Sequence, residues 1–266
     1  MRIGAPPEKW LPMLGKTERD YRPLLGMELE LFHERGYDEE QLSRFRSRLD
    51  TEQQCFLAAA MYDASVHGAE FVTNPASLDI HAKFWPGLIE SLVEFGFVVK
   101  PNSGGLHVHV SKTGMLPGQL TILLALVIYG GQDWERFQEL VHGRTGIRWA
   151  AGVPAARACP DNFQASWKLA ESYIQEFHNN PNYTKRYVRL NLVPTETLEF
   201  RQGHATLSYR RIMTRLEFVD AMMAFTHTAC RKGPLHKLFN RGLPSVRGFL
   251  QWVERQDRWP HLLESS

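Results

Sequence analysis

The chain has few of the features that would identify a function at once. Its three cysteines, Cys55, Cys159 and Cys230, are far apart and form no CxxC spacing, so neither a disulfide framework nor a cysteine zinc site is expected. The longest apolar run, at 120–129, is much shorter than the about 20 residues of a membrane helix. Residues 1–14 contain no apolar segment typical of a signal peptide. We therefore expect a cytoplasmic protein with no membrane partner.

An excess of charge of one sign is also missing. Lys and Arg number 31 and Asp and Glu number 29, which gives a net charge of +2. A domain that binds nucleic acid through bulk charge is usually strongly basic, so nucleic acid is not an expected partner. A modified nucleotide stays open as a substrate, because a groove can be basic in a protein that is neutral overall. The hydrophobic content of 43% excludes a disordered chain and allows a large core.

The common phosphate-binding and hydrolase motifs are absent as well. The sequence contains no GxxxxGK[ST] loop, no GxGxxG after an expected strand, no kinase motif set and no GxSxG segment. A bound nucleotide would therefore be held by metal ions and side chains rather than by a glycine loop. No histidine lies at a recognisable spacing from a candidate Cys or Ser nucleophile, which gives little support to nucleophilic hydrolysis.

The hydrophobic pattern indicates pairs of strands with helices between them. We expect a strand at 22–32, a helix at 51–60 capped by Thr51, two strand or turn segments within 61–75, a helix whose first turn contains Pro86, hairpins at 97–111 and 183–203, a helical stretch from Pro117 to His142 broken near Gly130, and helices at 161–178 and 208–232, the last one amphipathic. This order predicts an α+β fold with an antiparallel β-sheet, an active site on one sheet face and helices on the other. Residues 1–20 form a lead-in, and residues 21–260 form one domain.

Four of the expected strands carry charged or polar side chains at positions i and i+2, which point to the same face of a strand. The pairs are Glu28 and Glu30, His107 and His109, Arg189 and Asn191, and Glu199 and Arg201. Any one pair is typical of a solvated face. Two neighbouring carboxylates repel each other and need a cation, however, and the other strands bring imidazoles and guanidiniums. A single face that gathers all four pairs would suit Mg²⁺ or Mn²⁺ and the phosphates of a nucleotide.

Two other interpretations stay open. His107 and His109 lie at a spacing that occurs in zinc hydrolases, in which a glutamate would complete the site. Alternatively, the chain is a non-catalytic protein of the same fold that binds a nucleotide or a metal. Tightly bound zinc without nucleotide binding would favour the hydrolase.

Five segments of the chain follow one another in a recognisable order: GMELE at 26–30, YDASVHGAEFVTNP at 62–75, SGGLHVHVS at 103–111, RYVRLNL at 186–192 and TLEFRQGHATL at 197–207. Together they resemble the amidoligase family of the glutamine synthetase and carboxylate–amine ligase superfamily. The chain departs from the family at Ala64, where the DGS motif has a glycine. The resemblance implies a fold like the glutamine synthetase catalytic domain. It also implies an ATP- and Mg²⁺- or Mn²⁺-dependent ligase that joins a small-molecule or peptide carboxylate to an amine through an acyl phosphate.

The resemblance also implies a role for each matched residue. The metal ligands would be Glu28, Glu30, Glu70, His107 and Glu199. Arg201, Glu70 and Arg189 would be catalytic, with Arg201 stabilising the transferred phosphoryl group. Nucleotide, phosphate or substrate would be bound or oriented by Arg186, Asn191, Arg201, His109, Asp63 and Ser65.

Residues outside these segments carry no readable chemistry. Trp134 is expected in the core, and His142 and His227 are expected at the surface or at helix ends. Substrate specificity would lie in the loops at 33–50 and 143–160. The sequence therefore predicts the type of reaction but not the two substrates.

Overall fold

The computed structural model describes residues 23–33, 38–63, 66–100, 103–128, 131–142, 163–179, 189–231 and 245–264. Its strands are β1 (Leu25–His33), β2 (Leu57–Asp63), β3 (Gly68–Thr73), β4 (Phe97–Val98), β5 (Gly105–Ser111), β6 (Leu190–Asn191) and β7 (Thr197–His204). Its helices are α1 (Glu39–Arg48), α2 (Thr51–Phe56), α3 (Leu78–Glu94), α4 (Gln119–Val127), α5 (Gly131–His142), α6 (Phe163–Asn179), α7 (Tyr209–Arg231), α9 (Val246–Glu254) and α10 (Pro260–Leu263).

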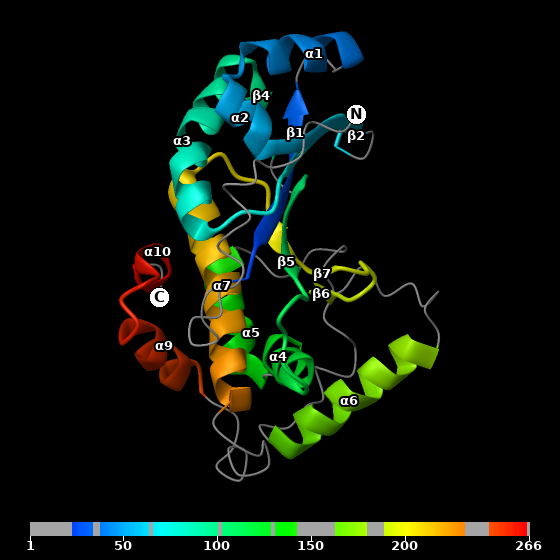
Figure 1. Cartoon of the computed structure of the whole chain (residues 1–266), viewed down its shortest axis with the longest axis vertical. Helices are drawn as coiled ribbons and strands as arrows, with labels where there is room; N and C mark the ends of the chain where they lie inside the picture. The colour runs from blue at the N-terminus through cyan, green and yellow to red at the C-terminus, as the bar shows by residue number, and fades with distance from the viewer. Residues whose placement is uncertain are drawn as a thin grey trace.

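The described strands form one sheet in the order β2-β3-β1-β5-β7-β6, with β4 also beside β1. Every pairing between them is antiparallel. Helices α3 and α7 lie along one face of this sheet (Figure 1). The predicted α+β class with an antiparallel sheet is therefore confirmed.

The sheet has one apolar face because its strands alternate. On β1, Met27, Leu29 and Leu31 are buried, whereas Glu28 and Glu30 are only partly covered. The buried side chains join those of α3, α4, α5 and α7 in one core. Burial of the apolar face against helices leaves the opposite face, with its charged side chains, available for a site.

The expected hairpin at 97–111 is wrong, because β4 and β5 do not pair with each other. Both lie antiparallel to β1 on the same side of it, β4 at Phe32 and His33 and β5 at 25–29. The chain therefore runs in the same direction in β4 and in β5. The turn signals near Gly104 lie between these two segments, which pair with the same strand. Gly104 has a φ of 78°, which is strained for other residues.

Two expected helix boundaries are also wrong. The helix predicted at 51–60 ends at Phe56, and the alanine-rich segment after it is strand β2, because pairing with β3 overrides the helix propensity of alanine. The helix is capped by Asp50 rather than Thr51, since the Asp50 side chain accepts a hydrogen bond from the Gln53 backbone N–H.

Pro86 does not lie in the first turn of its helix, because α3 already begins at Leu78. The proline lies in the helix interior, where it removes one N–H donor and its ring crowds the carbonyl four residues earlier. The helix packs closely on the sheet. His81, fully buried, has its Nε2 atom 2.8 Å from the carbonyl oxygen of Leu25 on β1, and its Nδ1 atom lies 3.1 Å from Nε1 of Trp85.

Helix α7 is buried over most of its length, from Ile212 to His227, rather than being amphipathic as predicted. The C-terminal segment covers it through buried carboxylates. Asp220 accepts a hydrogen bond from Trp259 Nε1 at 2.8 Å, and Glu217 accepts one from the Leu262 backbone N–H at 2.9 Å. The charged groups within α7 therefore serve packing between helices.

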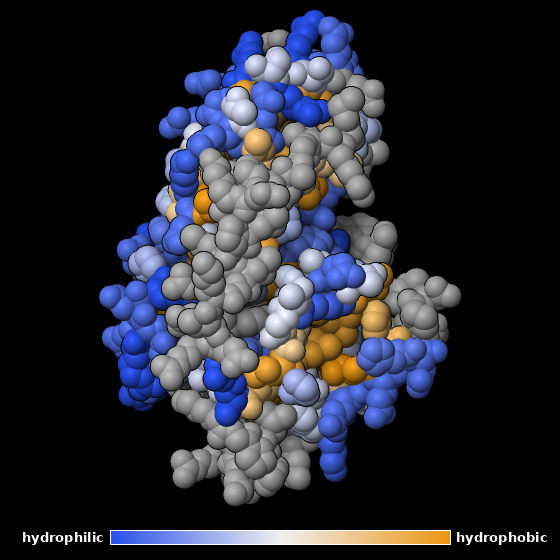
Figure 2. All heavy atoms as spheres, viewed as in Figure 1, coloured by the Kyte–Doolittle hydropathy of each residue, from blue (hydrophilic) through white to orange (hydrophobic). Residues whose placement is uncertain are grey.

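The remaining helices follow the expected pattern. The apolar stretch before His142 is broken into α4 and α5, and α6 covers the helix predicted at 161–178. His142 lies at the end of α5, one of the two positions expected for it, and is buried there. Apolar side chains gather beside α6, whereas much of the rest of the visible surface is hydrophilic (Figure 2). Among the described helices, none has the length and apolar character to cross a membrane.

Candidate functional site

The charged face of the sheet brings the predicted strand pairs into register. Glu30 on β1 lies directly opposite Glu70 on β3, and Glu28 lies directly opposite His107 on β5. Directly opposite residues on antiparallel strands project to the same face with their Cβ atoms about 5 Å apart. Three carboxylates and one imidazole therefore adjoin one another across three strands.

The same face continues across β7 to β6. His109 on β5 lies opposite Glu199 on β7, and Glu199 lies opposite Asn191 on β6. Five strands, in the order β3-β1-β5-β7-β6, thus contribute polar side chains to one face of the sheet. The alternation within each strand predicts which residues share a face, and the register places them side by side.

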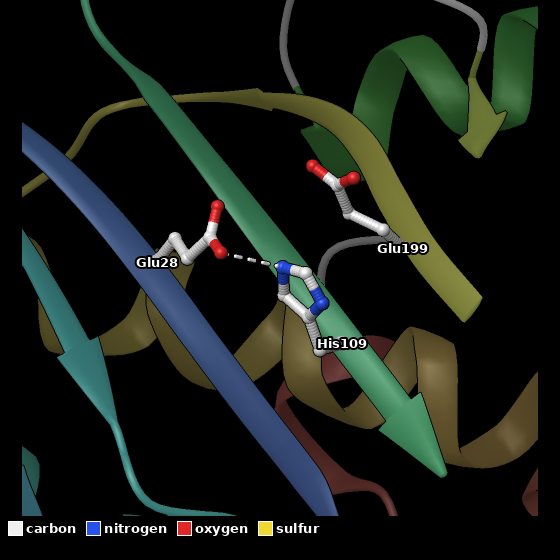
Figure 3. A group of neighbouring side chains, drawn as sticks. All are labelled: Glu28, His109 and Glu199. Atoms are coloured by element: carbon white, nitrogen blue, oxygen red, sulfur yellow. Dashed lines mark ion pairs between the residues drawn. The ribbon is translucent and has the colours of Figure 1, made fainter. Parts of the chain in front are cut away.

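Glu28, His109 and Glu199 form the group best arranged to hold a metal ion. One ligand atom from each of the three lies within 4.8 Å of the others. The side chains extend toward one another from β1, β5 and β7 (Figure 3). Two carboxylates and one imidazole are ligands that suit Mg²⁺ or Mn²⁺.

Glu28 is held by both predicted histidines. Its Oε1 atom lies 2.9 Å from Nε2 of His109, and its Oε2 atom lies 3.3 Å from Nδ1 of His107. Burial opposes ionisation of Glu28, but the hydrogen bonds and charges of the two imidazoles outweigh it and hold its pKa well below the ordinary range. Burial likewise opposes the charged form of His109, but the hydrogen bond to Glu28 and the charges of Glu28 and Glu199 raise its pKa.

Glu70 shows how crowded the carboxylates are. Burial, together with the nearby charges of Glu28, Glu30 and Asp63 and a hydrogen bond to Glu28, raises the pKa of Glu70 to about 8. A divalent cation on this face would offset that repulsion. The crowding and the donor set both fit a bound divalent metal, for which Glu28, His109 and Glu199 supply the three ligands and Glu70 and Glu30 lie beside them.

Glu199 is buried, and both of its oxygens have donors. Its Oε2 atom accepts a hydrogen bond from Asn191 Nδ2 at 2.6 Å. Its Oε1 atom is paired with Arg201 Nη1 and lies 3.4 Å from Nδ1 of His107. The side chain of Asn191 is itself fixed, since its Oδ1 atom accepts a hydrogen bond from the Val193 backbone N–H at 3.0 Å. The two hydrogen bonds together orient the Asn191 amide so that its N–H group points to Glu199.

The Glu30 carboxylate contacts the backbone at the start of β5, just after the break between β4 and β5. Its Oε2 atom accepts a hydrogen bond from the backbone N–H of Gly105 at 2.6 Å. Gly105 also leaves space for the His107 ring, because a Cβ atom at this position would lie 2.5 Å from Nε2 of His107. The glycine turn thus places a carboxylate and an imidazole at the same time.

Arg189 faces a different partner from the metal group. Its Nη2 atom forms an ion pair with Oε1 of Glu135 on α5 at 2.5 Å. Its backbone carbonyl accepts a hydrogen bond from the Arg201 N–H at 3.0 Å, so Arg189, directly before β6, is a neighbour of Arg201 on β7. Ser65 and Arg186, together with Ala64, lie outside the described residues.

Three contacts of the site were missed in the sequence. Thr197 Oγ1 lies 3.3 Å from Nδ1 of His109, and its position two residues before Glu199 on the same face was the signal that could have found it. Glu135 had no such signal, because it lies on a helix far from the matched segments. Lys112 donates hydrogen bonds to the carbonyls of Pro194 and Thr195, at 2.5 and 3.2 Å, in the β6–β7 turn.

Comparisons with known proteins give only distant likenesses. No protein-family model matches the chain, and no curated protein matches its sequence. Among solved structures, the complex between the prokaryotic ubiquitin-like protein Pup and its ligase PafA aligns with a TM-score of 0.40 and 12% identity over 77% of this chain. A GmaS–ADP complex aligns with a TM-score of 0.42 and 14% identity over 96% of this chain and 68% of that chain. The chain spans 46% of the chain matched in the Pup–PafA complex.

Proposed function

We propose that the chain is an ATP- and Mg²⁺- or Mn²⁺-dependent carboxylate–amine ligase of the amidoligase type. The observation that carries this proposal is the arrangement of Glu28, His109 and Glu199 within 4.8 Å of one another on one sheet face. Arg201 lies beside Glu199, and Glu70 lies on the opposite side of the group. The resemblance of the five sequence segments to the amidoligase family supports the same conclusion.

The reaction would proceed in two steps. The substrate carboxylate attacks the γ-phosphorus of ATP, which breaks the bond to the β-phosphate oxygen and yields an acyl phosphate and ADP. The amine then attacks the acyl carbon, and phosphate leaves as the amide forms. A divalent metal held by Glu28, His109 and Glu199 would neutralise phosphate charge.

The side chains of the protein would position the reactants and compensate charge. Arg201 would stabilise the phosphoryl group during transfer. Glu70 would orient the amine and accept its proton, as a carboxylate beside the metal group. Arg189 would bind phosphate from β6, beside Arg201, and the remaining predicted residues would support the nucleotide.

A hydroxamate assay tests the proposal without knowledge of the amine. The chain is incubated with ATP, Mn²⁺, a panel of amino acids and dicarboxylates, and hydroxylamine, which attacks an acyl phosphate to give a coloured hydroxamate. We expect ADP and hydroxamate to form together with at least one carboxylate. ADP release that no carboxylate stimulates, with no hydroxamate, would sink the proposal.

The zinc hydrolase is the weaker alternative. The ligand group contains one imidazole and two carboxylates, whereas hydrolytic zinc sites typically use more nitrogen or sulfur ligands. Metal analysis of the purified chain distinguishes the two, because a hydrolase would retain about one tightly bound zinc per chain and would not need ATP.

A further inference from the structure

Both oxygens of Glu199 already have a donor, so a cation bound to this carboxylate must share it with these donors or displace one of them. Its Oε2 atom is taken by Asn191, whose amide orientation is fixed by the Val193 N–H. The Oε1 atom is on the side of Glu28, because Nδ1 of His107 lies 3.4 Å from it and 3.3 Å from Glu28 Oε2, and Arg201 contacts this same oxygen. The contact between Arg201 and Glu199 therefore stands where a metal ligand bond would form.

Arg201 occupies this position as a nearly buried cation. Its side chain is 17% exposed and that of Glu199 is 5% exposed, so water screens the pair little. The Arg201 Nε atom is buried and has no hydrogen-bond partner among the described residues. The guanidinium thus has an unused N–H inside the site, which an anion could accept.

We propose that Arg201 is the internal counter-ion of Glu199, and that metal binding displaces it and turns it into an anion-binding group. The inference rests on the proposed function, because it assumes that Glu199 is a metal ligand. A divalent cation bound to Glu199 Oε1 repels the Arg201 guanidinium, and it neutralises the Glu199 carboxylate in place of that guanidinium. The released guanidinium then has free N–H donors for a phosphate. Its planar pair of donors matches the spacing of two phosphate oxygens. Metal binds first, and the phosphate ligand binds second.

The first test is a calorimetric titration of the full chain with Mn²⁺ in the absence of nucleotide. Arg201→Gln removes the competing cation, and we expect it to bind Mn²⁺ about tenfold more tightly than the wild type. Arg189→Gln is the matched control, because the Arg189 backbone bonds to that of Arg201 but its side chain pairs with Glu135 outside the metal group. Its Mn²⁺ affinity should stay within about twofold of the wild type.

An unchanged or weaker Mn²⁺ affinity in Arg201→Gln would overturn the proposal, and so would an equal increase in both variants, which would indicate a general field effect. Circular dichroism checks that each variant is folded. Crystal structures of the wild type with and without Mn²⁺ give a readout that needs no variant. The Arg201 guanidinium should leave Glu199 when Mn²⁺ is bound, and a retained pair beside a bound ion would refute the exchange.

This outcome is separate from that of the ligase proposal. The Mn²⁺ titration uses no ATP and no substrate, whereas the hydroxamate assay uses the wild type only. A chain that forms hydroxamate but shows no effect of Arg201→Gln on Mn²⁺ binding would remain a ligase with a different role for Arg201. A chain that binds no Mn²⁺ with either residue at position 201 would refute the counter-ion exchange directly.

Discussion

The Nε2 atom of His109 lies 2.9 Å from Oε1 of Glu28, and this contact joins β1 to β5, two strands that are distant in the sequence. Both members of this pair favour their charged forms in the metal-free chain. The Glu28 pKa is held below its ordinary range and the His109 pKa is raised, so the two attract each other in the metal-free chain. A metal would replace the proton on His109.

Glu28→Gln tests whether this carboxylate is a ligand. The amide is nearly isosteric but neutral, so we expect Mn²⁺ affinity to fall by at least about tenfold, as it does when groups that support a metal are changed. The fold should persist, because loss of the Glu28 charge also relieves its repulsion of Glu70. Calorimetry and thermal unfolding measure the two effects. Glu40→Gln, at an exposed glutamate on α1, is the control, and equal Mn²⁺ affinities in the two variants would contradict the assignment.

Gly105→Ala should disturb the site, whereas Gly26→Ala should not. A Cβ atom at position 105 would lie 2.5 Å from Nε2 of His107, which is buried and must move. At position 26 the nearest atoms, on His109 and Thr73, are 3.7 Å away, an ordinary contact. We expect Gly105→Ala to lower the free energy of unfolding by about 1–3 kcal/mol and to weaken Mn²⁺ binding.

The control for this prediction is built into the comparison, since both glycines lie in matched segments of the same sheet. Urea unfolding and Mn²⁺ titration of the two variants provide the measurement. If Gly26→Ala proves as damaging as Gly105→Ala, the clash with His107 is not the cause.

The face of each strand could be predicted from the sequence, but the register between strands could not. Glu28 and Glu30 share a face because side chains alternate along a strand, and this follows from the spacing alone. That Glu30 meets Glu70 while Glu28 meets His107 depends on how distant strands align, and no local pattern encodes the alignment. The sequence therefore predicted the composition of the site without its contacts.

Local propensity failed where tertiary contacts decided. The segment from Leu57 to Asp63 is rich in alanine, which favours a helix, but it pairs with β3 as a strand. The turn residues before Gly105 indicated a hairpin, but both flanking strands pair with β1. The partner of β2 follows it closely along the chain, whereas β1 is far in sequence from β4 and β5.

Lys112 should stabilise the turn between β6, which contains Asn191, and β7, which contains Glu199. Its Nζ atom donates hydrogen bonds to the carbonyls of Pro194 and Thr195, and Lys112→Met removes them. We expect the free energy of unfolding to fall by about 1–2 kcal/mol, a typical cost for charge-assisted hydrogen bonds that are partly exposed. Hydrogen exchange at the amides of the turn should become faster.

The matched control for Lys112 is Lys83→Met. Lys83 pairs with Glu52, but both side chains are about half exposed, so the cost should be well below about 1 kcal/mol. An equal loss of stability in the two variants, with no change in exchange at the turn, would show that Lys112 does not anchor the hairpin.

His81 should make the stability of the protein depend on pH between about 4 and 6.5. Burial lowers its pKa from 6.5 to about 4, although its hydrogen bond to the Leu25 carbonyl acts in the opposite direction. Below pH 6.5 the unfolded chain binds a proton at this residue that the folded chain does not, so the free energy of unfolding falls as the pH falls. The loss reaches about 3 kcal/mol near pH 4, and the effect is absent above pH 6.5.

His81→Gln isolates this effect, because glutamine can donate to Leu25 and accept from Trp85 but does not titrate. Other groups titrate alike in both proteins, so the difference in their free energies of unfolding reports His81. That difference should shift in favour of the variant by about 3 kcal/mol between pH 7 and pH 4, as measured by urea unfolding across the range. Parallel curves for the two proteins would mean that His81 has a similar pKa in the folded and unfolded chain. The neutral ring would then not be what joins α3 to β1.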